Sequence, residues 1–211
     1  MNTQKEGRHI AVAGNIGSGK TTLTELLSKH YKWSAHYEDV DDNPYLNDFY
    51  EEMQRWSFNL QVYFLNSRFS QVLDIRNSGE TVIQDRTIYE DAYIFAPNLH
   101  DMGLMPSRDY RSYKKLFGLM SSLVKPPDLL IYLRATVPTL VRQIQTRGRD
   151  YENTIRIDYL KNLNDRYEGW IESYDLGKLL IIDVNNTDFI NQPKDLSAVI
   201  DKVDAELHGI F

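Results

Sequence analysis

The sequence of 211 residues contains no cysteine, which excludes disulfides and cysteine-ligated zinc sites and suits a reducing cytoplasm. It has no run of about 18 consecutive apolar residues, so no membrane-spanning helix is expected. The net charge of −6 argues against a nucleic-acid-binding surface, which needs an excess of basic side chains. The short apolar run near the N-terminus is not that of a signal peptide. We therefore expect a cytoplasmic protein that binds neither membranes nor nucleic acids.

Short aliphatic segments alternate with longer amphipathic segments along the chain. The short ones predict buried strands at residues 9–13, 81–84, 129–133 and 179–184, with a weaker fifth strand just before residues 38–42. The longer ones predict helices at residues 21–30, 47–76, 110–124, 136–147, 157–176 and 196–207. This alternation indicates one α/β domain over residues 1–211, with a five-stranded parallel sheet covered by helices on both faces. Ligands of such sheets bind beyond the carboxyl ends of the strands.

A glycine-rich segment, GNIGSGKT at residues 14–21, matches the phosphate-binding pattern G-x-x-x-x-G-K-[ST] at every required position. It lies between the first predicted strand and the first predicted helix, as in the P-loop NTPase fold. Its backbone N–H groups and the helix N-terminus are suited to bind phosphate oxygens. Lys20 would neutralise the β- and γ-phosphates, and the Thr21 hydroxyl would bind Mg²⁺. The expected nucleotide contacts are Gly14, Asn15, Ile16, Gly17, Ser18, Gly19, Lys20, Thr21 and Thr22.

The patterns that would make this loop part of a GTPase are missing. Neither D-x-x-G nor [NT]-K-x-D occurs in the sequence. The strand at 129–133 is followed by Arg134 rather than by an aspartate, so the candidate acid on the metal side is Asp85, after the strand at 81–84. A small-molecule kinase needs in addition a base for the attacking hydroxyl, cations around the transferred phosphoryl group and a pocket that excludes water.

Further short motifs follow the phosphate loop in a fixed order. They are Glu38 with Asn43 and Pro44, Tyr50, RWSF at 55–58, Gln61, Arg68, DRT at 85–87, YED at 89–91, IFA at 94–96, RGR at 147–149 and DVN at 183–185. Taken together, over most of the chain, they resemble the deoxynucleoside kinase family, especially the bacterial deoxyadenosine/deoxyguanosine kinases. The resemblance implies a homodimeric enzyme of nucleotide salvage that uses ATP and Mg²⁺ to phosphorylate the 5′-hydroxyl of a deoxynucleoside.

The resemblance also implies roles for the charged side chains. Glu38 would be the general base, and a carboxylate suffices because the loose transition state of phosphoryl transfer needs only modest base strength. Arg86 would contact the 5′-oxygen and the phosphates, and Asp85 would lie on the Mg²⁺ side. Arg147 and Arg149 would belong to a small lid at about residues 147–156 and would stabilise negative charge over the ATP.

One position of the lid departs from the family pattern. A further arginine is expected at Gln143, whereas the chain carries Arg142 beside it. A shift of one residue rotates a helical side chain by about 100°. Arg142 could replace the missing arginine or be a solvated helix charge, and the sequence leaves both interpretations open.

The substrate pocket is expected around the helix at 47–76. Gln61 and Arg68 are seven residues apart and would project from the same helix face. A glutamine offers one donor and one acceptor, which matches the amino group and ring nitrogen of adenine. By resemblance Gln61 reads the base, Arg68 and Asp91 form a charge pair beside it, and Phe95 stacks on its ring.

The resemblance assigns two further contacts to the sugar and two to the donor nucleotide. Tyr50 and Glu152 would hold the 3′-hydroxyl and thereby orient the 5′-hydroxyl for in-line attack. The loop that contains Asp183 and Asn185 would cover the adenine of ATP, largely through backbone contacts.

The base that is preferred is predicted from the residue after the pocket aspartate. Ala92 follows Asp91 in this chain, as it does in the bacterial purine kinases. Deoxycytidine-type relatives carry an arginine at this position instead. This favours deoxyadenosine, followed by deoxyguanosine, with deoxycytidine as a further candidate. The phosphate loop also permits two other functions: a thymidylate-type nucleoside monophosphate kinase, and an ATPase or nucleotide-gated binding module that transfers no phosphoryl group.

Overall fold

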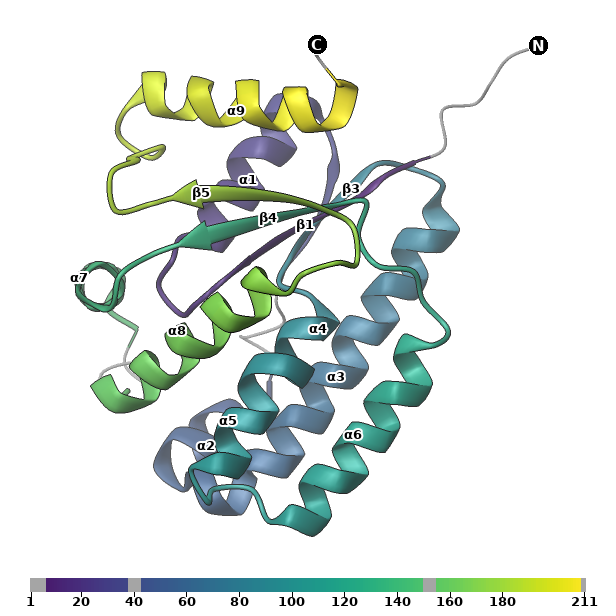
Figure 1. The fold of residues 1–211 in the computed structure, drawn as a ribbon, viewed down its shortest axis with the longest axis vertical. Coiled ribbons are helices and arrows are strands. Elements are labelled where there is room, and N and C mark those ends of the chain that lie inside the picture. Colours follow the sequence, from purple (N-terminus) through teal and green to yellow (C-terminus); the bar gives the residue numbers. More distant parts are fainter. Residues whose placement is uncertain (1–6, 38–42, 150–154, 210–211) are drawn as a thin grey trace.

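The sheet is parallel throughout and has the strand order β2-β3-β1-β4-β5 in the computed structural model, which describes residues 7–37, 43–149 and 155–209 (Figure 1). The strands are β1 (His9–Gly14), β2 (Ser34–His36), β3 (Val82–Asp85), β4 (Leu129–Arg134) and β5 (Lys178–Asp183). The four strongly predicted strands agree with these bounds to within one residue, and the weak fifth strand is β2. The predicted α/β fold of the P-loop type is confirmed.

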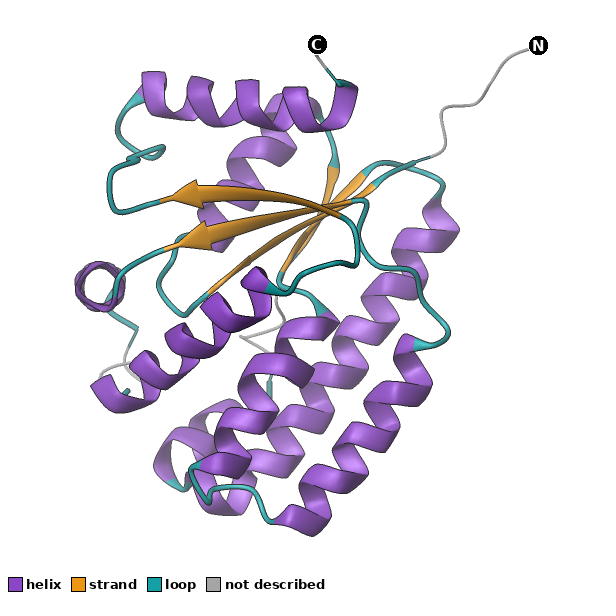
Figure 2. Cartoon of the chain, in the orientation of Figure 1, coloured by secondary structure: helices purple, strands orange, loops and turns teal. Residues whose placement is uncertain are grey.

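Two hydrophobic cores lie on opposite faces of the sheet because successive strand side chains point in opposite directions. Ile10 and Val12 of β1 pack into one core, with α1, α7 and α9. Ala11 and Ala13 pack into the other, with the helices between β2 and β4 and with α8. Figure 2 shows the two helical layers on either side of the strands. The near-continuous apolar character of the central strands thus reflects burial on both faces.

The helices of the described residues follow the predicted pattern with two corrections. Their bounds are α1 (Lys20–Tyr31), α2 (Leu46–Glu51), α3 (Met53–Ser78), α4 (Ile88–Glu90), η1 (Asp91–Phe95), α5 (Ala96–Asp101), α6 (Ser107–Ser121), α7 (Val137–Arg147), α8 (Ile157–Glu172) and α9 (Pro193–His208). None of these helices is both long enough and apolar enough to cross a membrane.

The first correction concerns the helix predicted at 47–76, which is two helices. Glu52 has φ −137° and ψ 73°, outside the helical region, so α2 ends before it and α3 begins after it. The second concerns residues 88–101, where no helix was predicted. Here α4, η1 and α5 follow one another, and the π-turn of η1 shifts the helical period, which hides the pattern from a search at 3.6 residues per turn.

Candidate active site

The phosphate loop joins β1 to α1 and depends on glycine for its shape. Gly17 has φ +82° and Gly19 has φ +93°, in the region that other residues rarely adopt. A Cβ atom on Gly17 would lie 2.7 Å from Cγ1 of Ile144, so glycine also lets α7 approach the loop. Lys20 begins α1, and its Nζ donates a hydrogen bond to the backbone oxygen of Asn15 at 3.0 Å. The ammonium group is therefore held at the loop.

The two expected metal-side residues lie next to each other. The Thr21 hydroxyl on α1 donates to Oδ2 of Asp85, at the end of β3, at 2.5 Å. Among the described residues there is no group of three or more histidine or acidic side chains that could hold a metal ion. One hydroxyl and one carboxylate suit Mg²⁺, which prefers oxygen ligands and is commonly held by one or two carboxylates together with substrate phosphates. These donors therefore fit Mg²⁺ bound with a nucleotide.

Arg86, the residue after Asp85, has a strained backbone. Its φ is +69°, a conformation that costs of the order of 1–3 kcal/mol for a residue other than glycine. Its backbone N–H donates to the Val12 oxygen at 2.9 Å, which ties the turn to β1. The guanidinium carbon lies 4.4 Å from the centre of the Phe95 ring, and the side chain is buried. The turn thus aims a buried cation into the site.

A cavity of about 240 Å³, here called the acceptor cavity, lies beside the phosphate loop. Its described lining residues are Ile16, Gly17, Lys20, Thr21, Tyr37, Leu46, Phe49, Tyr50, Leu60, Gln61, Phe64, Asp85, Arg86, Asp91, Phe95, Arg147, Arg149 and Tyr159. The cationic side chains line the end of the cavity that is next to the phosphate loop. Apolar side chains of α2 and α3 form the wall at the other end. Of the predicted substrate residues in the described ranges, Arg68 alone does not line it.

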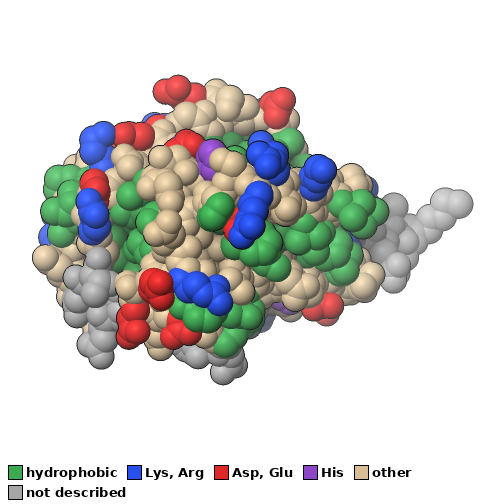
Figure 3. Space-filling model, turned by 90° about the horizontal axis from the view of Figure 1, so that it is seen from below, with side chains coloured by type: hydrophobic (Ala, Val, Ile, Leu, Met, Phe, Trp, Pro, Cys, Tyr) green, Lys and Arg blue, Asp and Glu red, His purple; other side chains and the backbone are tan. Residues whose placement is uncertain are grey.

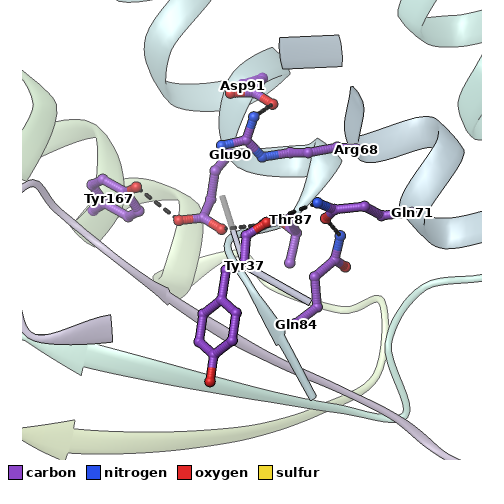
Figure 4. A network of polar contacts seen from close by, with 8 residues as sticks. All are labelled: Tyr37, Arg68, Gln71, Gln84, Thr87, Glu90, Asp91 and Tyr167. Atoms are coloured by element: carbon purple, nitrogen blue, oxygen red, sulfur yellow. Dashed lines mark hydrogen bonds and ion pairs between the residues drawn. The ribbon is translucent and has the colours of Figure 1, made fainter. Parts of the chain in front are cut away.

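Arg68 instead stands behind Asp91. Its Nη1 lies 3.1 Å from Oδ2 of Asp91, and the two side chains are 3% and 2% exposed (Figure 4). The guanidinium also lies over the ring of Phe64, with 4.8 Å from its carbon to the ring centre. Gln61 lies on the same face of α3 as Arg68 and is buried. Its Oε1 has no hydrogen-bond partner among the described residues. A buried acceptor of this kind calls for a donor on a bound molecule.

A second and larger hollow, here called the donor groove, lies on the other side of the phosphate loop and has a volume of about 690 Å³. It is lined by Gly17, Gly19, Lys20, Thr21, Thr22, Arg142, Gln143, Thr146, Arg147, Arg149 and residues 184–191. Gly17, Lys20, Thr21, Arg147 and Arg149 line both hollows. Donor groove and acceptor cavity therefore meet at the P-loop lysine.

Several predicted nucleotide contacts lie apart from these linings. Gly14, Asn15 and Ser18 line neither hollow, and Asn15 donates to the backbone oxygen of Leu160 on α8 at 3.1 Å. Asp183 is also outside the groove lining; its Oδ1 accepts from the backbone N–H of Asn185 at 2.8 Å and so orders that loop. Glu38 and Glu152 lie outside the described residues.

Glu90 lies in the YED motif at 89–91, and the sequence predicts no role for it. It is fully buried, and its carboxylate accepts hydrogen bonds from the backbone N–H of Gly14 at 3.2 Å, from that of Thr87 at 2.7 Å and from the Tyr167 hydroxyl at 2.8 Å. Figure 4 shows it between the Arg68–Asp91 pair and Tyr167. Two consecutive acids, Glu90 and Asp91, in the otherwise apolar or aromatic run 88–96 are the signal in the sequence, because charges are rarely buried without partners.

The donor groove and the acceptor cavity share the P-loop lysine, and arginines line both. This arrangement defines a phosphotransferase that acts on two small molecules. The sequence model of the deoxynucleoside kinase family matches residues 10–208, and the chain belongs to this family. It is a nucleotide-binding transferase, as the motifs predicted, and the family assignment does not favour the nucleoside monophosphate kinase.

Individual relatives agree with this assignment. The chain is 37% identical over 201 residues to a deoxyadenosine/deoxycytidine kinase of Bacillus subtilis, covering 94% of this chain and 93% of that one. It is 40% identical over 196 residues to a deoxyadenosine kinase of Dictyostelium discoideum, covering 92% and 78%. A solved structure of a deoxyadenosine kinase from M. mycoides with bound dATP has a TM-score of 0.82 at 28% identity, covering 93% and 99%.

Proposed function

We propose that the protein transfers the γ-phosphoryl group of ATP to the 5′-hydroxyl of a deoxynucleoside, preferably deoxyadenosine, for nucleotide salvage. The observation that carries this proposal is the meeting of the donor groove and the acceptor cavity at Lys20 and Thr21. A phosphoryl group held there lies between a nucleotide on one side and an acceptor on the other. The described residues form one sheet with helices on both faces, which supports a single kinase domain.

The charged residues divide the chemical work. Lys20, Arg86, Arg147 and Arg149 offset the negative charge on the transferred group, most strongly in the transition state, where charge moves onto the leaving oxygen. Mg²⁺, held by Thr21 and Asp85, would neutralise phosphate charge when it is bound with the nucleotide. Glu38 takes the proton of the 5′-hydroxyl as the new O–P bond forms.

The acceptor cavity is proposed to hold the deoxynucleoside. Gln61 reads the base, with Asp91 oriented by Arg68, and Phe95 packs beside the ring. Tyr50 lines the same cavity, and with Glu152 it holds the 3′-hydroxyl. The two arginines of residues 50–68, Arg55 and Arg68, are absent from the described cavity lining. The arginines that do line it, Arg86, Arg147 and Arg149, are assigned to the transferred phosphoryl group, so the described lining offers no additional arginine for a phosphate on the acceptor.

The base preference rests on the buried Oε1 of Gln61, which suits adenine and cytosine, and on Ala92 after Asp91, which favours a purine by resemblance to the bacterial purine kinases. Adenine presents an amino donor beside a ring-nitrogen acceptor, which complements a glutamine amide. Cytosine presents the same pair, and guanine presents the opposite one. The names of relatives include deoxyadenosine/deoxycytidine kinase and also a deoxyguanosine kinase of Lactobacillus johnsonii at 38% identity. We therefore place deoxyadenosine first and keep deoxycytidine and deoxyguanosine as its competitors.

The test is ADP release from Mg·ATP in the presence of each of the common ribo- and deoxynucleosides. We expect deoxyadenosine to give the largest kcat/KM and ribonucleosides to give little stimulation. Absence of stimulation by every nucleoside, together with steady hydrolysis of ATP alone, would refute the kinase and favour the ATPase. A maximum with deoxycytidine or deoxyguanosine would overturn the preference for adenine and leave the reaction unchanged.

A homodimer is part of the same proposal. Large apolar side chains are exposed on elements that contact one another: Leu73 on α3, Tyr93 on η1, Leu119 on α6 and Leu123 just after it. Apolar groups on a surface favour association with a second copy. Figure 3 shows hydrophobic side chains grouped among charges of both signs on the face seen from below. The molar mass in solution, measured by light scattering, distinguishes monomer from dimer.

A further inference from the structure

The fully buried carboxylate of Glu90 joins two parts of the site, the phosphate loop and the turn at Arg86, and also bonds to a tyrosine of α8. Oε1 accepts from the Gly14 N–H at 3.2 Å and from the Tyr167 hydroxyl at 2.8 Å, and Oε2 accepts from the Thr87 N–H at 2.7 Å. Gly14 ends β1 and begins the phosphate loop, Thr87 follows Arg86, and Tyr167 lies on α8. Both oxygens are thus used, and every recorded partner is a donor.

The two backbone N–H groups belong to segments with unusual backbone conformations. Gly14 has φ +152°, and a Cβ there would lie 2.6 Å from Oγ of Ser18. Thr87 follows Arg86, whose φ is +69°. The N–H of Arg86 bonds to Val12, and the N–H of Thr87 bonds to Glu90, so the peptide groups on both sides of Arg86 are fixed. A strained turn persists only when its surroundings hold it in this way.

We propose that Glu90 is a positioning residue that aligns the phosphate loop with the Arg86 turn for phosphoryl transfer. The inference rests on the proposed function, because it assigns Arg86 and the loop to one reaction. A carboxylate has acceptors on two sides and so joins the two N–H groups directly. The next residue, Asp91, bonds to Arg68 beside the acceptor cavity. Consecutive acids thereby link the phosphate-binding part of the site to the nucleoside-binding part.

The test replaces one acceptor and keeps the shape. Glu90→Gln turns one oxygen into an NH₂ group, which must face a donor N–H and push it away. Misplacement of catalytic groups by about 1 Å can lower turnover about 100-fold, so kcat should fall about 10- to 100-fold. The dissociation constant for deoxyadenosine, measured by calorimetry, should stay within roughly threefold, because Gln61 and the Arg68–Asp91 pair are untouched.

Tyr167→Phe is the matched control, since it removes only the hydroxyl donor and leaves both backbone N–H groups bonded to Glu90. Its kcat should stay within roughly threefold of wild type. Glu90→Asp keeps the charge but shortens the side chain, so it cannot reach both N–H groups, and its kcat should fall as well. It also serves if Glu90→Gln does not fold, as judged by its thermal transition.

Some outcomes would overturn the inference. Unchanged kcat in Glu90→Gln, full activity in Glu90→Asp, or an equal loss in Tyr167→Phe would each remove the positioning role. A parallel loss of nucleoside binding would indicate a general structural role instead. If wild type shows no nucleoside-stimulated turnover, the proposed function fails by itself. In that case the effect of Glu90 on the phosphate loop is tested by the affinity for Mg·ADP. This affinity should be at least about fivefold lower in Glu90→Gln than in wild type, and unchanged in Tyr167→Phe.

Discussion

The hydroxyl of Thr21 donates a hydrogen bond to Oδ2 of Asp85 at 2.5 Å, and this contact joins the first turn of α1 to the end of β3. Asp85 is 1% exposed, so its charge is little screened by water. We predict that Asp85→Asn, which keeps the size and removes the charge, raises the Mg²⁺ concentration for half-maximal activity about tenfold and lowers kcat. A magnesium titration of nucleoside-stimulated ADP release measures both quantities.

Asp48→Asn is the control for the metal prediction, because Asp48 is exposed on α2. It should leave the magnesium titration unchanged. Equal titration curves for Asp85→Asn and wild type would show that this carboxylate does not serve the metal.

The second prediction concerns the proposed base, Glu38, which lies outside the described residues. Glu38→Gln removes the proton acceptor and keeps the side-chain size. We expect kcat to fall at least about 100-fold with the affinity for deoxyadenosine nearly kept. Single-turnover rates with saturating ATP and calorimetric binding of the nucleoside separate the two effects. Asp39→Asn, in the neighbouring acid, is the control, and a full rate in Glu38→Gln would remove Glu38 from this role.

The third prediction concerns stability. Arg68 and Asp91 form a buried ion pair at 3.1 Å between α3 and η1. Asp91→Asn removes the counter-charge from a buried guanidinium, and we expect the free energy of unfolding to fall by about 3–5 kcal/mol. Urea denaturation followed by circular dichroism measures this change.

Two further variants serve as controls for that measurement. The double variant Arg68→Met/Asp91→Leu removes both charges and should regain much of the stability. Asp165→Asn breaks the exposed pair with Lys161 and should hardly affect the free energy of unfolding. If Asp91→Asn were as stable as wild type, the prediction that the buried pair contributes to the free energy of unfolding would be wrong.

The fourth prediction is a pH dependence that arises far from the phosphate loop. His9 begins β1, and its Nε2 lies 2.9 Å from Oε1 of the buried Gln84. Burial lowers the pKa of His9 from 6.5 to about 4; the Gln84 hydrogen bond and the charge of Asp128 oppose this shift, and His36 adds to it. Because the folded protein binds the proton more weakly than the unfolded chain, this contribution to stability is lost as the pH falls from about 6.5 toward 4.

His9→Gln removes this titration. Between pH 7 and pH 5 wild type should lose about 2 kcal/mol more of its free energy of unfolding than the variant does. Urea denaturation at both pH values provides the measurement. The exposed His30 on α1 supplies the control His30→Gln, which should behave as wild type. Equal losses in wild type and His9→Gln would show that protonation of His9 does not oppose folding.

The sequence alone predicted the strands, because burial on both faces leaves short aliphatic segments that can be seen without a structure. It also predicted the phosphate loop, whose glycines are required by local backbone geometry, and the family, whose motifs keep a fixed order. The seven-residue spacing of Gln61 and Arg68 placed both on one face of α3, as found. Local conformation and short-range periodicity determine all of these features.

Only the tertiary structure decided which of these residues meet. The break at Glu52 and the π-turn of η1 depend on packing rather than on local propensity. Gln61 lines the acceptor cavity while Arg68 stands behind Asp91, a difference in depth that helical spacing cannot encode. Glu90 joins Gly14 to Thr87 across 73 positions of sequence separation between those two residues. Such contacts arise when parallel strands bring their carboxyl ends to one edge of the sheet, and that juxtaposition exists only once the chain has folded.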